Sequence, residues 1–175
     1  MIQHPTLPNI QDRSSLAAIL RERQAAGQFV VFTNGCFDLL HLGHVRYLQA
    51  ARALGDVLVV GLNSDASTRL LKGPKRPLVT ENERAEVLAA LACVDYVTIF
   101  EEPTAVALVE LLRPDVYVKG GDYAAPGGPV FDAARLPEAA PVLAAGGQVR
   151  LIPYLSGHST SELIERIVRR FGAGG

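Results

Sequence analysis

The chain has 175 residues, of which 49% are apolar, and its 17 Lys and Arg nearly balance its 18 Asp and Glu. This length and apolar content suffice for a hydrophobic core, and we predict one domain over residues 1–175. A net charge of −1 gives no general attraction for nucleic acid, and no apolar run is long enough to cross a membrane. Residues 1–11 lack the features of a secretory signal, and Cys36 and Cys93 make no disulfide framework, so we expect a cytoplasmic protein.

Strand-like and helix-like segments alternate along the chain, which predicts a doubly wound α/β fold with a five-stranded parallel sheet. The predicted strands are 29–32, 57–62, 96–100, 116–118 and 149–152. The predicted helices are 12–26, 41–54, one opening at 81–84, 104–112 and 161–171. Residues 123–147 are rich in Ala, Gly and Pro, and we favour a variable surface loop over a loop that covers a site.

The most informative stretch is residues 33–44, TNGCFDLLHLGH, between the first predicted strand and the following helix. In an open parallel sheet, ligands bind beyond the carboxyl ends of the strands, which is where this stretch lies. His41 and His44 share one helix face, and the unpaired N–H groups of a first helical turn attract anions. Gly43 would let a ligand approach the backbone, and Gly35 permits an unusual backbone angle in the turn. The pattern indicates a polyphosphate site, although such a histidine pair alone is also typical of an ordinary surface.

Three further strands are followed by polar, flexible sequence, at residues 61–65, 119–122 and 157–161. Each is explained by turn chemistry alone, but together they predict that one rim of the sheet carries the site. Ser159 and Thr160 begin the last helix, where they would cap it, bind a second phosphate, or do both. We predict no metal site formed by the protein, because the histidine pair lacks a nearby acidic or cysteine third ligand.

Three cationic residues are candidates for binding phosphate at the same rim of the sheet. Lys72 and Lys75 lie in the cationic loop KGPKRP, which is either solvated or able to close over a triphosphate. Arg84 lies in a first helical turn, where the dipole disfavours a cation, so we expect it to pair with Glu81 or reach a phosphate.

Three aspartates are further candidates. Asp38 and Asp122 would orient a histidine or substrate hydroxyl groups. Asp65 would cap the helix that follows the second strand.

These motifs resemble the cytidylyltransferase-like group of nucleotidyltransferases, whose signature H-x-G-H matches residues 41–44. Within that group, residues 33–44, 61–65, 84–88 and 118–123 are most similar to sugar-phosphate adenylyltransferases, best to those that act on D-glycero-D-manno-heptose 1-phosphate. The resemblance covers residues 12–122 and 148–170. It implies transfer of an adenylyl group from ATP, which carries Mg²⁺, to a sugar 1-phosphate with release of pyrophosphate.

By this resemblance, His41 and His44 would bind phosphates and stabilise the α-phosphorus as it becomes five-coordinate, and Lys72 would steady the departing pyrophosphate. The resemblance also implies a wider nucleotide-binding set: Thr33, Asn34, Gly35, Phe37, Gly43, Arg84, Lys119, Gly120, Asp122, Ser159 and Thr160. The long 123–147 segment departs from the family's usual connection, which leaves the acceptor open. His158 also departs, since relatives often carry an aromatic or aliphatic residue there.

Other functions fit parts of the pattern. The nearest alternative is a glycerol-3-phosphate cytidylyltransferase that uses CTP, and a second is a nucleotide-binding regulatory module without turnover. A dinucleotide dehydrogenase is disfavoured because the first strand–helix turn lacks G-x-G-x-x-G. Dimers are common among proteins of this group, so a homodimer is a further expectation.

Overall fold

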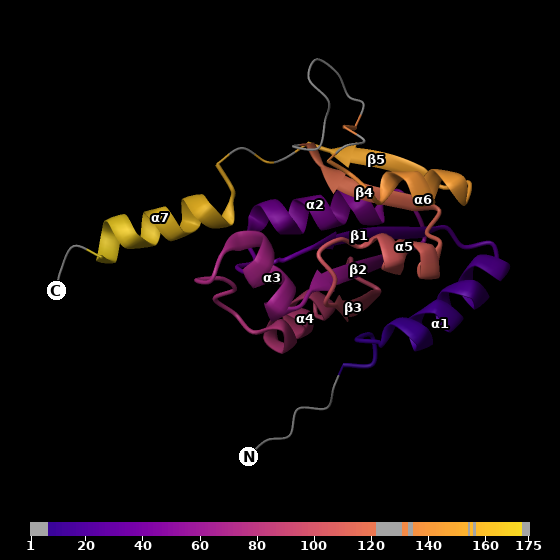
Figure 1. Ribbon diagram of the computed structural model, residues 1–175, viewed down its shortest axis with the longest axis horizontal. Helices are drawn as coiled ribbons and strands as arrows, with labels where there is room; N and C mark the ends of the chain where they lie inside the picture. The colour runs from indigo at the N-terminus through magenta and orange to yellow at the C-terminus, as the bar shows by residue number, and fades with distance from the viewer. Residues whose placement is uncertain (1–6, 122–130, 133–134, 154, 156, 173–175) are drawn as a thin grey trace.

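A fully parallel sheet of five strands organises the computed structural model of this chain. The strands are β1 Val30–Gly35, β2 Val57–Asn63, β3 Tyr96–Phe100, β4 Val116–Gly120 and β5 Gln148–Ile152. Their spatial order is β3-β2-β1-β4-β5, so the chain builds one half of the sheet outward from β1 and then returns to build the other (Figure 1). The predicted doubly wound parallel sheet is confirmed. The structure describes residues 7–121, 131–132, 135–153, 155 and 157–172.

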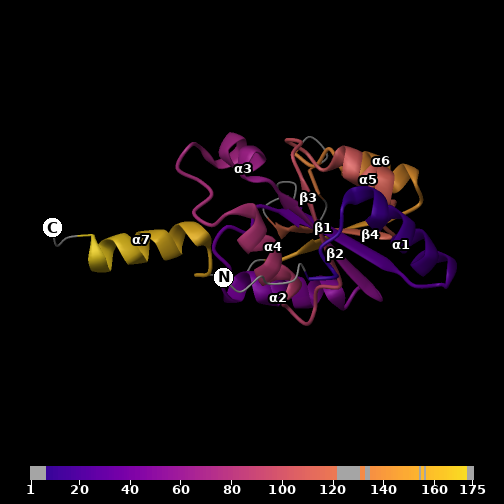
Figure 2. The same ribbon diagram turned by 90° about the horizontal axis from the view of Figure 1, so that it is seen from below.

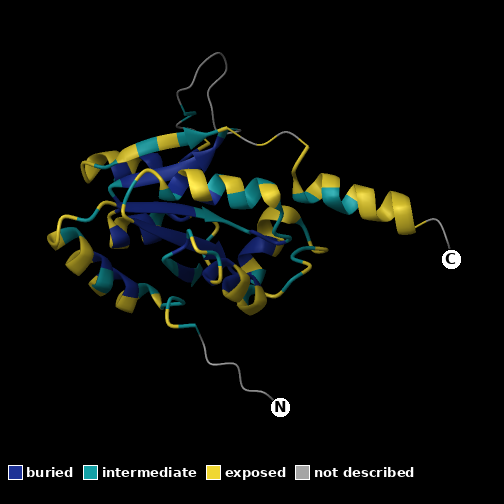
Figure 3. Ribbon diagram, turned by 180° about the vertical axis from the view of Figure 1, so that it is seen from behind, coloured by how far each residue is buried: buried dark blue, intermediate teal, exposed yellow. Residues whose placement is uncertain are grey.

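Helices cover both faces of the sheet. They are α1 Arg13–Ala25, α2 Leu42–Arg52, α3 Asp65–Lys72, α4 Glu81–Ala89, α5 Val106–Leu112, α6 Ala139–Ala144 and α7 Thr160–Phe171. One core cluster, with Leu20, Phe32 and Leu108, joins α1, α5 and α6 to the sheet, and a second, with Leu48 and Leu88, joins α2 and α4 to it. Figure 2 shows the first group and α2 on opposite sides, and Figure 3 shows the buried sheet between them. Burial of each large aliphatic side chain contributes about 1.5–3 kcal/mol, so these clusters hold the layers together.

The amino ends of the strands are lined with carboxylates. Three aspartates accept backbone N–H groups at or beside the strand starts: Asp56 from Phe29, Asp95 from Leu58 and Asp115 from Val30. The histidines and lysines considered above lie at the opposite, carboxyl ends. The amino ends are thus held by hydrogen bonds to carboxylates, and the candidate anion-binding groups lie at the other end of the sheet.

Strands β1 and β4 extend further than the predicted ranges 29–32 and 116–118. Gly35 still pairs with Leu62 of β2, and Gly120 still pairs with Ile152 of β5. Strand ends depend on pairing with a neighbouring strand, which apolar periodicity does not record. Residues 33–35 and 119–120 are therefore strand residues rather than turn residues.

Helix α7 projects away from the sheet (Figure 1). None of its residues is buried, and Phe171 near its end is 78% exposed. Glu162 and Glu165 each precede an arginine by four residues, a spacing that supports a solvated helix. Among the described residues, no helix combines the length and apolar character that a membrane crossing needs.

Candidate active site

Two stacked histidines lie at the start of α2, directly after the turn that leaves β1. His41 is the N-cap residue, and its side chain makes no capping hydrogen bond, while His44 lies in the first turn. The two imidazole centroids are 3.9 Å apart with an interplanar angle of 25°. The Phe37 ring lies 5.3 Å from the His44 ring and supports it from the β1 side. Both imidazoles are therefore held in fixed positions beside unpaired N–H groups of a helix N-terminus.

Partial burial lowers the pKa of both imidazoles and so favours their neutral forms. Burial lowers the pKa of His44 from 6.5 to about 4, with a further lowering by neighbouring His41. Burial also lowers the pKa of His41, and His158 adds to that shift. The Nδ1 atoms of both rings are buried, and no residue that the structure describes makes a hydrogen bond to them. A polyanion placed against this pair would favour its protonated form, so anion binding and proton uptake are coupled here.

The start of α7 packs against the start of α2. A Cβ on Gly43 would lie 2.8 Å from the His158 carbonyl oxygen and 2.9 Å from Cε1 of His41. The absence of a side chain at Gly43 therefore lets the chain before α7 approach α2, and the approach of a ligand there stays a prediction. Two helix N-termini consequently meet at the histidine pair, and their dipoles both favour an anion.

Ser159 caps α7, as one of the two predicted interpretations required. Its Oγ accepts the Glu162 N–H at 3.1 Å, and the Glu162 carboxylate accepts the Ser159 N–H at 2.8 Å. Thr160 is the first helical residue and is partly exposed. The cap uses one backbone N–H group of the first turn and leaves others for an anion.

The unusual backbone angle of the β1–α2 turn belongs to Phe37, which has φ +44°, and the prediction that Gly35 adopts it is wrong. Gly35 is the last residue of β1, and a Cβ there would lie 3.1 Å from the Phe37 ring. A larger residue at position 35 would press on the ring, because the turn folds Phe37 back over the end of its own strand.

Thr33 is buried inside the sheet layer rather than open to a ligand. Its hydroxyl lies 2.7 Å from the Tyr47 hydroxyl, which donates to the Val118 carbonyl at 3.1 Å. Since Tyr47 has one proton to donate, Thr33 acts as the donor to Tyr47. The expectation that Thr33 holds phosphate oxygens is therefore not met in this arrangement, and its hydroxyl instead fixes α2 against β1 and β4.

Asn34 and Lys119 connect the carboxyl ends of β1 and β4. Lys119 donates to the Asn34 carbonyl at 3.1 Å, and the Asn34 side-chain oxygen accepts from the Tyr117 hydroxyl at 2.7 Å. Lys119 is largely buried, and its charge lies between the carboxyl ends of β1 and β4. Gly120 pairs within the sheet beside it, and Asp122 lies outside the described residues.

Arg84 has a structural role, in which it joins several segments by hydrogen bonds. The prediction that it pairs with Glu81 is wrong. Its Nη2 donates to Asp65 at 2.7 Å, and its other nitrogens donate to backbone carbonyls: Val79 at 2.9 Å, Cys36 at 2.6 Å and Asn63 at 2.9 Å. The side chain is 1% exposed, so it does not face a nucleotide phosphate as we expected. Glu81 lies in the same helical turn as Arg84, whereas the observed partner, Asp65, is the first residue of α3.

The other two aspartate predictions in this region are also corrected. Asp65 is not the cap of α3, because Ser64 caps that helix by accepting the Ser67 N–H at 3.1 Å. Asp38 does not orient a histidine, because both its oxygens accept hydrogen bonds from residues 76–79. Lys72 ends α3 and is exposed, as is Lys75 in the following loop.

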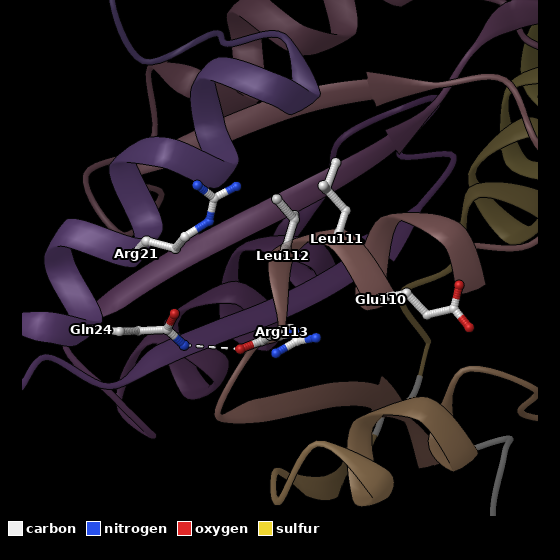
Figure 4. A pocket seen from close by; sticks show the side chains of 6 residues that line it. All are labelled: Arg21, Gln24, Glu110, Leu111, Leu112 and Arg113. Atoms are coloured by element: carbon white, nitrogen blue, oxygen red, sulfur yellow. Dashed lines mark hydrogen bonds between the residues drawn. The ribbon is translucent and has the colours of Figure 1, made fainter.

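A cavity between α1 and α5 lies apart from this rim (Figure 4). Arg21 and Gln24 line one side, Glu110 and Arg113 line the other, and Gln24 donates to the Arg113 carbonyl at 2.9 Å. Arg113 precedes β4, so the cavity lies toward the amino ends of the strands. None of the predicted site residues lines it. Among the described residues, no three His, Cys, Asp or Glu side chains are grouped so that they could hold a metal ion.

Comparisons with known proteins show the family to which the chain belongs. A sequence model of the cytidylyltransferase-like family matches residues 32–166. The bifunctional protein HldE of Syntrophotalea carbinolica is 53% identical over 94% of this chain and 32% of its own length. The HldE of Helicobacter pylori is 47% identical over 97% of this chain and 33% of its own length. The chain thus spans about a third of these relatives.

A solved structure shows the same fold. The lipopolysaccharide core biosynthesis protein of Thermoplasma volcanium superposes with a TM-score of 0.58 at 30% sequence identity, covering 74% of this chain and 98% of that one. The chain belongs to the cytidylyltransferase-like family, and it is a nucleotidyltransferase.

Proposed function

We propose that the protein transfers the adenylyl group of ATP to D-glycero-D-manno-heptose 1-phosphate, forming an ADP-sugar and pyrophosphate. The observation that carries this proposal is the stacked His41–His44 pair between two helix N-termini. The similarity to HldE proteins and the match of residues 33–44 and 118–123 to sugar-phosphate adenylyltransferases support the choice of nucleotide and acceptor.

The chemistry requires little from the protein beyond position and charge. A phosphate oxygen of the sugar attacks the α-phosphorus, and the bond from that phosphorus to the oxygen bridging to the β-phosphate breaks. The attacking oxygen is already anionic near neutral pH, so no strong general base is needed. Fixed donors must instead stabilise charge that develops on the α-phosphoryl oxygens.

His41, His44 and the first-turn N–H groups would supply those donors. Lys72, on the exposed end of α3, would meet the departing pyrophosphate, and Lys119 would lie beneath the nucleotide or the acceptor. Mg²⁺ would arrive with ATP as part of the substrate and offset the triphosphate charge. A cytoplasmic location, where ATP is available, and a homodimer remain part of the proposal.

Pyrophosphate release tests the reaction. Purified protein with Mg²⁺ is given ATP or CTP, each with heptose 1-phosphate or with glycerol 3-phosphate. Release with ATP and heptose 1-phosphate alone is expected. Release with CTP and glycerol 3-phosphate would instead support the cytidylyltransferase alternative, and nucleotide binding without release would support the regulatory module.

His44→Ala tests the site within the same assay. Loss of one donor to the transition state lowers turnover by about 10²–10³-fold. Arg21→Gln, which changes the distant cavity, serves as the control and should turn over like the parent protein. Unchanged turnover of His44→Ala would remove that histidine from the mechanism.

A further inference from the structure

Arg76 differs from the two lysines of the same loop because a buried carboxylate holds it. Its Nε donates to Oδ2 of Asp38, whose side chain is 1% exposed, whereas Lys72 and Lys75 are exposed. The Arg76 side chain itself remains 19% exposed. Arg76 is therefore oriented, and it still reaches the surface.

The backbone beside Arg76 is fixed to the same turn. Oδ1 of Asp38 accepts the N–H groups of Leu78 at 2.7 Å and of Val79 at 3.1 Å. The Val79 carbonyl accepts from Arg84, which also donates to the Cys36 carbonyl. Both backbone groups of Val79 are thus held by buried charged side chains. Residues 76–79 are consequently attached to the turn that leads from Phe37 to His41.

The attachment leaves most donors of Arg76 available. A guanidinium has five N–H donors, and the hydrogen bond to Asp38 uses only the one on Nε. The Nη nitrogens make no hydrogen bond to any residue that the structure describes. Their fork geometry suits two phosphate oxygens at once. Because Arg76 is already oriented, it loses less side-chain entropy when it binds a phosphate than an exposed lysine would.

We propose that Arg76 is a fixed phosphate-binding cation of this site, directed at the β- and γ-phosphates, and that Asp38 is a positioning residue acting through it. This inference rests on the proposed function for the location of the triphosphate. Asp38 lies three positions before His41, and the neighbouring Phe37 ring contacts His44. The Asp38–Arg76 pair therefore lies beside the histidine pair. Sequence reasoning assigned the loop's role to its lysines and missed the arginine, because the partner of Arg76 lies 38 positions earlier.

Calorimetric binding of ATP, pyrophosphate and AMP tests the role of Arg76. Arg76→Gln should weaken ATP and pyrophosphate by about 10–100-fold, the range for a charge-assisted hydrogen bond, and AMP by less than about 3-fold. Arg76→Lys keeps the charge but cannot bind Asp38 and two phosphate oxygens together, so an intermediate loss is expected. Arg21→Gln, with the same charge change in the distant cavity, should bind all three ligands like the parent.

A double-mutant comparison tests Asp38. In Asp38→Asn the amide oxygen can still accept the Leu78 and Val79 N–H groups, but no second acceptor remains for Arg76. Asp38→Asn should weaken pyrophosphate binding, and Asp38→Asn/Arg76→Gln should bind pyrophosphate no more weakly than Arg76→Gln alone. Additive losses would show that Asp38 does not act through Arg76 and would overturn that part.

Several results would overturn the assignment of Arg76. Parental pyrophosphate affinity in Arg76→Gln would do so, as would an equal loss of AMP and ATP affinity, which would indicate a distorted site. Parental protein that binds neither ATP nor pyrophosphate would also overturn it. Parental protein that binds ATP but releases no pyrophosphate with any acceptor would contradict only the proposed reaction, and the binding comparison would still decide Arg76.

Discussion

Neutral, buried His44 should make the protein lose stability in mild acid. The pKa of this imidazole is about 4 in the folded chain against an ordinary 6.5, chiefly because of burial. Below pH 6.5 the unfolded chain therefore binds a proton that the folded chain does not. The free energy of unfolding is highest above pH 6.5, and it falls as the pH drops toward 4.

The size of the effect follows from the shift. One pKa unit corresponds to about 1.36 kcal/mol, so the full loss is about 3 kcal/mol below pH 4 and about 2 kcal/mol at pH 5. His44→Gln removes the titrating group and keeps a polar side chain. Other groups titrate in both proteins, so the difference between their pH responses isolates His44.

Urea unfolding at pH 8, 6 and 5 measures this difference. Between pH 8 and pH 5 the parent protein should lose about 2 kcal/mol more than His44→Gln does. Gln49→Ala, an exposed substitution on α2 that removes no titrating group, is the control and should respond to pH like the parent. Parallel responses of the parent and His44→Gln would refute the conclusion that burial keeps this imidazole neutral.

Two further substitutions probe the contacts around the site. Gly43→Ala would bring a Cβ to 2.8 Å from the His158 carbonyl oxygen and force the start of α7 away from α2. Pyrophosphate release should therefore fall at least about 10-fold. Release at the parental rate would contradict this packing. Arg84→Met should lower the free energy of unfolding, measured with urea, by about 3–5 kcal/mol because Asp65 and three carbonyls lose their donor. Arg69→Met, on the exposed side of α3, is the control and should change it by less than about 0.5 kcal/mol. Equal effects of the two substitutions would refute the structural role of Arg84.

The contrast between Ser159 and Arg84 shows which parts of the site could be predicted. The cap of Ser159 depends on Glu162, three residues away, and helix geometry alone brings these groups together. The partners of Arg84 come from residues 36, 63, 65 and 79, and only residue 79 is near it in sequence. Its position in a first helical turn predicts a charge that needs a partner, which the structure confirms, but the partner is Asp65 and not Glu81 of the same turn.

Local pattern by itself determined the alternation of strands and helices, the parallel sheet, and the placement of His41 and His44 where β1 passes to α2. These features depend on side-chain periodicity and on residues within one or two turns of each other. Tertiary structure alone decided that Thr33 faces Tyr47, that Asp38 holds Arg76, and that Gly43 admits the His158 carbonyl. Each of these contacts joins segments whose proximity follows from how the layers pack, and a buried polar group bonds to whichever partner that packing brings within reach.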